Sequence, residues 1–378
     1  MKITGIEPIL AGDRYLFLKL TTDEGLVGYG ECGAWGYQEA TAGVLKQMEK
    51  MIVGLDPMNT EFIWNALARN LHFRGSITQA ALSGIDIALW DLKGKYFGVP
   101  CYQLLGGKTR EKIRIYVNAR GRNGDEIAEA ARGLKEQGYN AIRFSIGHPK
   151  DADGRCGENF SALVRRVEET MRKVREAVGD NMDVAIENHR GLRPAEAIEL
   201  GRALEKYNPY FYEDPIPDNQ EAMATVIRNC VVPVATGERF INPAEFDSLM
   251  SHTDVRYIRP DMCVCGGLTA GKKIAAEAEV KGIYVIPHNP LGPISTAACL
   301  QLDAVIPNFE VQEYPAMNGK CRLDREMKEP FHVENGYIIL PEKPGLGIEL
   351  IDDIDKVFPF KGAYGGINLH ADGSIVDR

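Results

Sequence analysis

The sequence predicts an α/β protein whose main part is a (β/α)7β barrel, that is, a TIM barrel without its last helix. Two observations predict this fold class. Between Ala185 and Tyr314, five short apolar runs each end in acidic or imidazole side chains, and successive ends lie 23 to 27 residues apart. One strand, one helix and two short loops consume a similar length, so these runs are typical of successive βα units. The alternation of strand-like and helical patterns also extends over residues 111–323, with eight strands and seven helices.

Residues 1–110 follow a different pattern, which predicts an α+β capping domain. Three strand-like runs come first, and a turn at residues 22–25 joins the last two into a meander. Helical patterns follow, and the last of them ends at Gly98, as a helix stop should. The expected strands are Lys2–Leu10, Tyr15–Thr22 and Leu26–Glu31, and the expected helices are Gln38–Val53, Asn59–Asn70 and Gln79–Phe97.

The barrel pattern covers residues 111–323 and starts just after the turn at Gly106 and Gly107. Parallel strands with right-handed crossovers bring the C-terminal strand ends onto one rim. The expected strands are Ile113–Asn118, Ala141–Ser145, Asp183–Glu187, Tyr210–Glu213, Pro233–Ala235, Val255–Ile258, Tyr284–Ile286 and Phe309–Gln312. The expected helices are Asp125–Gln137, Phe160–Val178, Pro194–Tyr207, Asn219–Arg228, Pro243–Ser251, Leu268–Lys281 and Ile294–Asp303.

The segment 324–378 contains one more strand-like run, Tyr337–Leu340, and we expect this segment to return to the capping domain and complete it. Two glycine-bearing loops are candidates for specificity. Gly30–Tyr37 mixes glycine with aromatic residues and could form a mobile flap, although Trp35 could equally be a plug for local core. The polar loop Gly147–Gly157 is expected on the rim of the barrel.

Glu187, Glu213 and Glu238 end three adjacent predicted strands, so we expect their carboxyl groups to form one cluster. Three carboxylates that close cannot all stay ionised without a strong counter-charge. Hard oxygen ligands that leave positions for water suit Mg2+. A single glutamate at a strand end is more often a solvated loop residue or an ion-pair partner, but three at even spacing favour a magnesium site.

Asp261 and His288 end the next two predicted strands, and this adjacency suits a catalytic dyad. Histidine has a near-neutral pKa suitable for a base, and a paired aspartate fixes its tautomer and raises its basicity. His189 lies two residues after Glu187, so alternation along the strand points both side chains the same way. His189 could protonate a departing hydroxyl group, or it could only hydrogen-bond to the metal ligands.

Composition is that of a soluble globular enzyme, with 44% hydrophobic and 26% charged residues. The formal net charge of -9 disfavours a nucleic-acid partner. The sequence has no apolar run of about 18 residues and no signal-peptide pattern, so we expect a cytoplasmic protein without a membrane partner. The eight cysteines are scattered, which is typical of neither a disulfide framework nor a zinc knuckle.

These rim residues, together with residues 81–95 and 104–108, resemble the enolase superfamily in its branch related to mandelate racemase and muconate lactonizing enzyme. The likeness covers nearly the whole chain and is closest to the galactonate and gluconate dehydratases of acid sugars. The motifs that carry it are Glu187-Asn188-His189, Glu213-Asp214-Pro215, Gly237-Glu238-Arg239, Pro260-Asp261, the run from Pro287 to Pro293, and Gln312-Glu313.

The resemblance implies a role for each matching residue. The implied roles are Mg2+ ligands for Glu187, Glu213 and Glu238, a base dyad for Asp261 and His288, a general acid for His189, and a hydrogen-bonding group at the substrate carboxylate for Glu313. Arg143, His148 and Trp35 are the candidate substrate contacts, because they lie on the rim side or in the expected flap. A homo-oligomer is the expected assembly.

The expected reaction is the Mg2+-dependent removal of water from a sugar acid, an aldonate such as galactonate or gluconate, to give a 2-keto-3-deoxy acid. Many relatives carry Lys-x-Lys at the end of the second barrel strand, whereas this chain has Arg143-Phe144-Ser145. The second base that an epimerase needs is therefore missing. Dehydration is favoured over an epimerase or cycloisomerase that uses the same enediolate, and a barrel with a vestigial metal site is the non-enzyme alternative.

Overall fold

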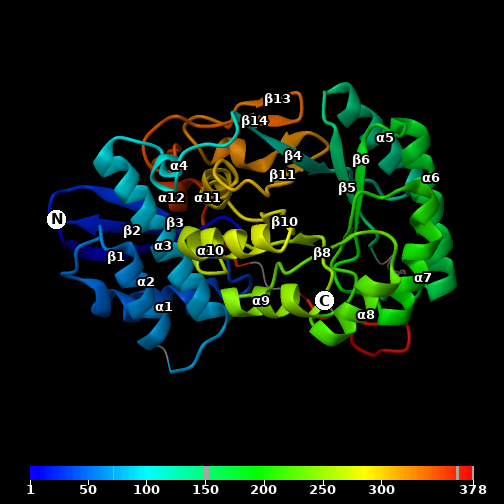
Figure 1. Cartoon of the computed structure of the whole chain (residues 1–378), viewed down its shortest axis with the longest axis horizontal. Coiled ribbons are helices and arrows are strands. Elements are labelled where there is room, and N and C mark those ends of the chain that lie inside the picture. Colours follow the sequence, from blue (N-terminus) through cyan, green and yellow to red (C-terminus); the bar gives the residue numbers. More distant parts are fainter. Residues whose placement is uncertain (71, 148–152, 363–365, 377–378) are drawn as a thin grey trace.

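Eight parallel strands form the barrel in the computed structural model, which describes residues 1–70, 72–147, 153–362 and 366–376 (Figure 1). Neighbouring strands pair in chain order from β4 to β10. The ring closes because Val285 in β10 forms a parallel bridge with Phe309, just before β11, and β11 pairs with β4. The strands are β4 (Lys112–Asn118), β5 (Ala141–Ser145), β6 (Asp183–Glu187), β7 (Tyr212–Glu213), β8 (Val234–Thr236), β9 (Tyr257–Ile258), β10 (Tyr284–Val285) and β11 (Gln312–Met317).

Seven helices alternate with these strands in the described part of the chain, so the predicted (β/α)7β arrangement is confirmed. They are α5 (Gly124–Glu136), α6 (Phe160–Val178), α7 (Pro194–Leu204), α8 (Gln220–Asn229), α9 (Pro243–His252), α10 (Gly267–Val280) and α11 (Pro293–Asp303). Strands β5 and β6 and helix α6 match the prediction to the residue, whereas β7 and β9 begin two residues later than predicted. Element ends are the least reliable part of a sequence-based assignment.

One layer of buried side chains fills the barrel interior, with one residue from each strand or from the position next to it. Three of these residues are alanines and the other five are larger aromatic or aliphatic residues. The buried residues of this layer are Tyr116, Ala141, Ala185, Phe211, Ala235, Tyr257, Ile286 and Val311. The barrel is therefore a packed core, and chemistry is confined to its rim.

The capping domain is an antiparallel sheet covered by helices, as the α+β prediction expects. Its strands β1 (Ile3–Ala11), β2 (Tyr15–Thr22) and β3 (Val27–Glu31) pair in order, and its helices are α1 (Gln38–Ile52), α2 (Thr60–Asn70), α3 (Ser76–Phe97) and the short α4 (Cys101–Leu104). Helix α3 is buried along most of its length, with β3 on one side and α10 of the barrel on another (Figure 1). Glycine allows this approach, because a Cβ atom on Gly30 would lie 1.9 Å from the carbonyl oxygen of Gly84.

The C-terminal segment contacts both parts of the molecule. Its strand β14 (Tyr337–Ile339) pairs with β13 (Val333–Glu334) and with the start of β4 in the barrel. Helix α12 (Ile354–Val357) then lies beside the capping sheet, where the Phe358 carbonyl accepts a hydrogen bond from the Gly12 N–H at 2.7 Å (Figure 1). Residues 366–376 return to the barrel, where the Cys156 N–H donates to the Leu369 carbonyl at 2.8 Å. The predicted boundaries at residues 110 and 323 stay predictions.

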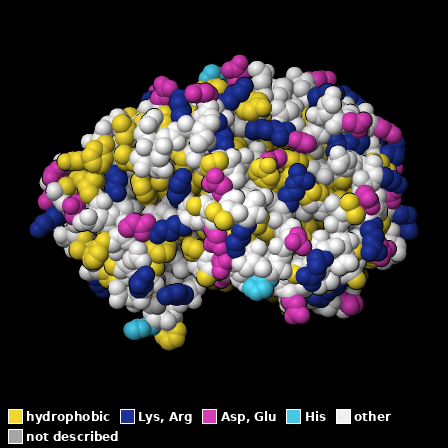
Figure 2. Space-filling view, viewed as in Figure 1, with side chains coloured by type: hydrophobic (Ala, Val, Ile, Leu, Met, Phe, Trp, Pro, Cys, Tyr) yellow, Lys and Arg dark blue, Asp and Glu magenta, His cyan; other side chains and the backbone are white. Residues whose placement is uncertain are grey.

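The surface in Figure 2 carries charges of both signs. Lys and Arg side chains are interspersed with Asp and Glu on that face, with no large single-sign patch among the described residues drawn there. Such a surface produces no strong field of one sign. None of the described helices is both long and apolar enough to cross a bilayer.

Candidate active site

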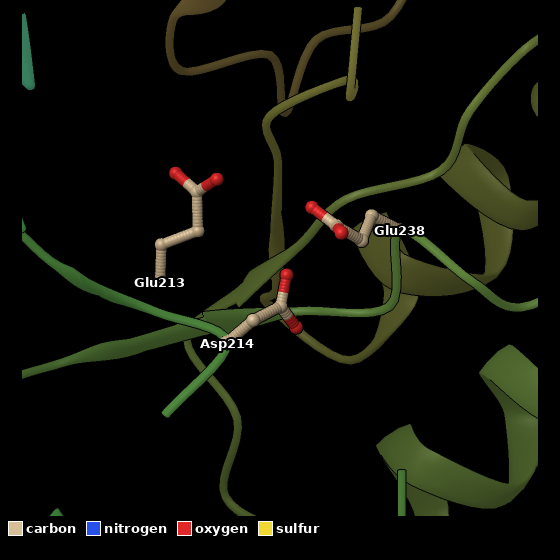
Figure 3. Close-up of side chains that lie close together, drawn as sticks. All are labelled: Glu213, Asp214 and Glu238. Carbon is tan, nitrogen blue, oxygen red and sulfur yellow. The ribbon is translucent and has the colours of Figure 1, made fainter. Parts of the chain in front are cut away.

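Three buried carboxyl groups converge at the ends of β7 and β8: those of Glu213, Asp214 and Glu238. One oxygen of each lies within 4.8 Å of the others, and the three groups turn toward a shared space (Figure 3). Consecutive side chains in a regular strand would point to opposite faces. Asp214 instead has a φ of 38°, outside the strand region, and its carboxyl group lies on the side of Glu213. The spacing in the sequence predicted Glu213 and Glu238 as members of this cluster, but not Asp214.

The donor set of this cluster fits a hard divalent cation. The Thr236 hydroxyl donates to Asp214 Oδ1 at 2.6 Å, whereas Oδ2 of Asp214 is buried without a hydrogen-bond partner. Burial raises the pKa of Glu213 to about 7 against the opposing charges of Arg143 and Arg259. Burial and the Glu238 carboxylate also raise the pKa of Asp214. A cation such as Mg2+ would stabilise the ionised form of these acids.

Glu187, the remaining predicted ligand, lies next to Glu213 because β6 and β7 pair in register. It is not part of the group of three. The Ser145 hydroxyl donates to its Oε2, and the Nη1 atom of Arg143 lies 3.6 Å from its Oε1. Arg143 also donates to Glu213, so its guanidinium group lies between the two glutamates. The role of Glu187 as a metal ligand stays a prediction.

Two fully or nearly buried arginines join the glutamates at the centre of the rim. Arg143, predicted as a substrate contact, has its Nη2 atom 3.0 Å from Glu313 Oε1. Arg259 is completely buried, and its Nη2 atom lies 3.1 Å from Glu213 and 2.7 Å from Glu313. Its Nη1 atom donates to the Tyr116 hydroxyl at 2.8 Å. Each guanidinium group therefore bridges two carboxylates that would otherwise repel each other.

A third buried arginine, Arg190, lies 2.8 Å from Glu238 through its Nη1 atom. The sequence pattern did not indicate Arg190 or Arg259 as site residues. Arg259 stands two residues before Asp261 at the end of β9, so strand alternation could have indicated that both face the same side. Arg190 has a φ of 67°, and no pattern in the sequence indicates where its side chain points.

Asp261 and His288 meet as the predicted dyad geometry requires. The two residues form a parallel bridge, and His288 Nδ1 lies 2.9 Å from Asp261 Oδ2. The other oxygen of Asp261 accepts the Cys263 N–H at 2.7 Å. With Nδ1 held by an acceptor, the neutral ring carries its proton there and Nε2 faces the cluster, 3.4 Å from Glu238 Oε2. Burial lowers the pKa of His288, but Glu238 and Asp261 outweigh this and raise it to about 9.

His189 lies on the rim, but not as strand alternation predicts. Strand β6 ends at Glu187, and His189 has a φ of 52° and an exposed side chain. Its Nε2 atom lies 3.2 Å from Arg190 Nη2. Partial loss of water and the Arg190 charge lower the pKa of His189, whereas Glu238 and Glu187 act in the opposite direction. The ring is thus close enough to the acidic cluster to be influenced by its charge.

Glu313 is a buried acceptor at the centre of the rim. It binds Arg143 and Arg259 and accepts the Asn289 N–H at 3.1 Å. Burial opposes its ionisation, but Arg143, Arg259 and His288 outweigh burial and lower the pKa of Glu313 to about 2. In this ionised form Glu313 accepts hydrogen bonds and orients the two arginines.

Trp35 and His148 are the remaining residues predicted to contact the substrate. Trp35 is 49% exposed, with the Arg14 guanidinium group 4.5 Å from its ring centre. Its segment is tied to the loop after Asp261, because the Gly33 N–H donates to the Cys263 carbonyl at 2.9 Å. His148 lies outside the described residues, as does part of the loop Gly147–Gly157.

Comparison with known proteins identifies similar chains. A family model described as the mandelate racemase/muconate lactonizing enzyme N-terminal domain matches residues 10–106, and one described as enolase C-terminal domain-like matches residues 126–354. The chain is 33% identical to the D-galactonate dehydratase of Xanthomonas campestris pv. campestris (strain B100) and 34% identical to that of Ralstonia nicotianae, over the full length of both partners in each case. The structure of an enolase from Agrobacterium radiobacter, with sodium and L-malate bound, has a TM-score of 0.91 at 29% identity and covers all of both chains.

Proposed function

Because this chain belongs to the mandelate racemase/muconate lactonizing enzyme family, we propose that it is a magnesium-dependent dehydratase of sugar acids. The substrate is an aldonate such as galactonate or gluconate, and the product is a 2-keto-3-deoxy acid. One observation carries the proposal: the hydrogen-bonded pair of Asp261 and His288 faces a cluster of buried carboxyl groups across 3.4 Å. A base beside a cation site is the arrangement that removal of a proton next to a carboxylate requires.

His288 is the base of the proposed reaction. Asp261 accepts the Nδ1 proton, so the lone pair of Nε2 is directed into the site and takes the proton from carbon 2 of the substrate. Asp261 is itself held by the Cys263 N–H, which keeps the ring orientation constant during the transfer. The Glu238 and Asp261 carboxylates that raise the pKa of His288 make its neutral ring a stronger base, so the reaction needs a pH at which this ring is neutral.

Glu213, Asp214 and Glu238, together with Glu187 at the edge of the cluster, would hold the cation. When bound, a divalent cation supplies positive charge beside the substrate carboxylate, whose negative charge grows as carbon 2 loses its proton. The protein alone cannot supply that charge. Three buried arginines, Arg143, Arg190 and Arg259, are already engaged with five carboxylates, those of Glu187, Glu213, Asp214, Glu238 and Glu313.

His189 is the acid that protonates the leaving hydroxyl group of carbon 3. Its exposed side chain can reach a substrate that enters from solvent, and its lowered pKa makes the protonated ring a stronger acid. In the neutral ring, Nε2 can accept a hydrogen bond from Arg190 Nη2 at 3.2 Å. The protonated ring has no acceptor left, and the Arg190 charge then favours release of its proton.

The surroundings of Arg143 support dehydration over epimerisation. An epimerase needs a second base on the opposite face of carbon 2. Arg143 stands at the strand end where many relatives carry lysine, but it is buried among Glu187, Glu213 and Glu313, and their charges raise its pKa despite burial. A guanidinium group held in this way cannot take a proton.

A library of aldonic and aldaric acids tests the proposal. Each acid is incubated with the purified protein and Mg2+, and 2-keto acid is measured as its semicarbazone, with a chelator-treated sample as control. We expect one or a few aldonates to give the keto acid only with Mg2+. Formation of an epimer without keto acid, or no conversion of any acid, would contradict the proposal. Gel filtration of the same sample tests the expected homo-oligomer.

A further inference from the structure

Two carboxylates of the capping domain hold the loops that carry the catalytic dyad. Glu31, at the end of β3, is fully buried. Its Oε1 atom accepts the Gly292 N–H at 2.7 Å, and its Oε2 atom accepts the Ser295 N–H at 2.8 Å. Gly292 is four residues after His288 and caps helix α11. A carboxylate at the start of a helix satisfies N–H groups that have no partner within the helix.

The loop from His288 to Gly292 is held on its other side as well. Arg322 donates to the Leu291 carbonyl at 2.7 Å, and its Nε atom donates to the Tyr15 hydroxyl of the capping domain at 3.0 Å. The approach of Glu31 is close, because a Cβ atom on Gly292 would lie 2.6 Å from its Oε1. The loop therefore has little freedom to move relative to the capping domain.

The loop that carries Asp261 is held in the same way. Asp86 in α3 is buried, and it accepts the Thr269 N–H at 2.9 Å and the Thr269 hydroxyl at 2.6 Å, at the start of helix α10. The hydroxyl of Ser83 accepts the Gly266 N–H at 2.9 Å. Both residues belong to the capping domain, whereas the loop leads directly from Asp261 into α10.

We propose that Glu31 and Asp86 are positioning residues, which set the distance between His288 and Asp261 from the capping domain. This inference rests on the proposed role of the pair as the base of the dehydratase. In the barrel, β9 and β10 share two paired residues and end three residues before the dyad, where one parallel bridge between Asp261 and His288 continues the pairing. Beyond that bridge the two loops are held by the capping domain. Displacement of a reacting group by about 1 Å can lower a rate about 100-fold. Glu31 also belongs to the segment Gly30–Tyr37 that contains Trp35, so the same residue connects the expected flap to the loop that follows His288.

Glu31→Gln and Asp86→Asn test the proposal, with Asp91→Asn as the matched control. Asp91 is a buried carboxylate on the same helix as Asp86, but it accepts the Tyr29 and Leu346 N–H groups, away from the dyad loops. For the first two variants we expect kcat to fall about 10- to 100-fold with KM changed less than about threefold. Exchange of the carbon 2 proton with solvent deuterium should fall in parallel. Asp91→Asn should lower the melting temperature but leave kcat within about twofold.

A second readout needs neither substrate nor metal. Long-range 1H–15N spectra of the imidazole rings, recorded at a pH at which His288 is neutral, report whether its ring keeps the proton on Nδ1. Glu31→Gln and Asp86→Asn should lose that signature, whereas Asp91→Asn keeps it. If a variant does not fold, Arg322→Lys and Thr269→Val loosen the same two loops more gently. A wild type without dehydratase activity but with the expected spectra would defeat the proposed function alone. Variants that lose stability as Asp91→Asn does, with wild-type kcat and spectra, would overturn the positioning role.

Discussion

Separate replacement of His288 and His189 divides the proposed reaction into its two proton transfers. His288→Asn removes the base, while the amide can still donate to Asp261, whose other oxygen keeps the Cys263 N–H. General base catalysis contributes about 100- to 10,000-fold, or about 3 to 5 kcal/mol of barrier. We therefore expect both dehydration and exchange of the carbon 2 proton to fall by at least about 100-fold.

His189→Asn should affect only the proton transfer to the leaving hydroxyl group of carbon 3. The backbone of His189 has a φ of 52°, which asparagine adopts more readily than most residues, and the exposed side chain contributes little to stability. Dehydration should slow by about 100-fold because the leaving hydroxyl loses its acid, whereas carbon 2 exchange continues as His288 releases its proton to solvent.

Proton NMR of the substrate in deuterium oxide measures both processes in one sample. His252→Asn is the control, because this exposed histidine at the end of α9 hydrogen-bonds to the Ser248 carbonyl of its own helix and should change neither rate. Exchange that survives in His288→Asn but vanishes in His189→Asn would reverse the assignment of base and acid. Loss of both processes in both variants would mean that the two histidines act as one unit.

Three further predictions concern the cation, the buried arginine and the interface. Titration calorimetry should find one Mg2+ per chain, and chelation should abolish turnover. Glu213→Gln should weaken Mg2+ binding at least about 10-fold, and an unchanged affinity would place the ion elsewhere. Arg259→Met should lower the free energy of unfolding in urea by about 3 to 5 kcal/mol, because Glu213 and Glu313 lose a buried partner, and a loss below about 1 kcal/mol would refute this. Burial raises the pKa of Asp86 from 3.8 to about 7, with Thr269 and Lys273 opposing and Glu61 adding to the rise. Between these two pKa values the folded state holds a proton that the unfolded state has lost, so the free energy of unfolding should fall as pH rises from 3.8 to about 7. Asp86→Asn should flatten the plot of unfolding free energy against pH in this range. Parallel plots for the wild type and Asp86→Asn would contradict the raised pKa.

Local patterns in the sequence were sufficient for the barrel and for most of its rim. Strand and helix periodicities are properties of short segments, so the order of elements and the ends of β5, β6 and α6 could be predicted without tertiary information. Parallel strands then bring their carboxyl ends together whatever the loops do. For that reason the spacing alone predicted that Glu213 and Glu238 would cluster and that Asp261 would meet His288.

Tertiary structure decided the residues whose direction no local rule specifies. Asp214 precedes a proline and should be extended by local preference, yet it has a φ of 38° and a hydrogen bond from Thr236 on the next strand. His189 and Arg190 likewise leave strand alternation through positive φ values. Contacts between Glu31 and α11 join residues 261 and 264 positions apart, which no periodicity can relate. Burial and ion pairing, which set the charge of each carboxyl group at the rim, exist only once the chain has folded.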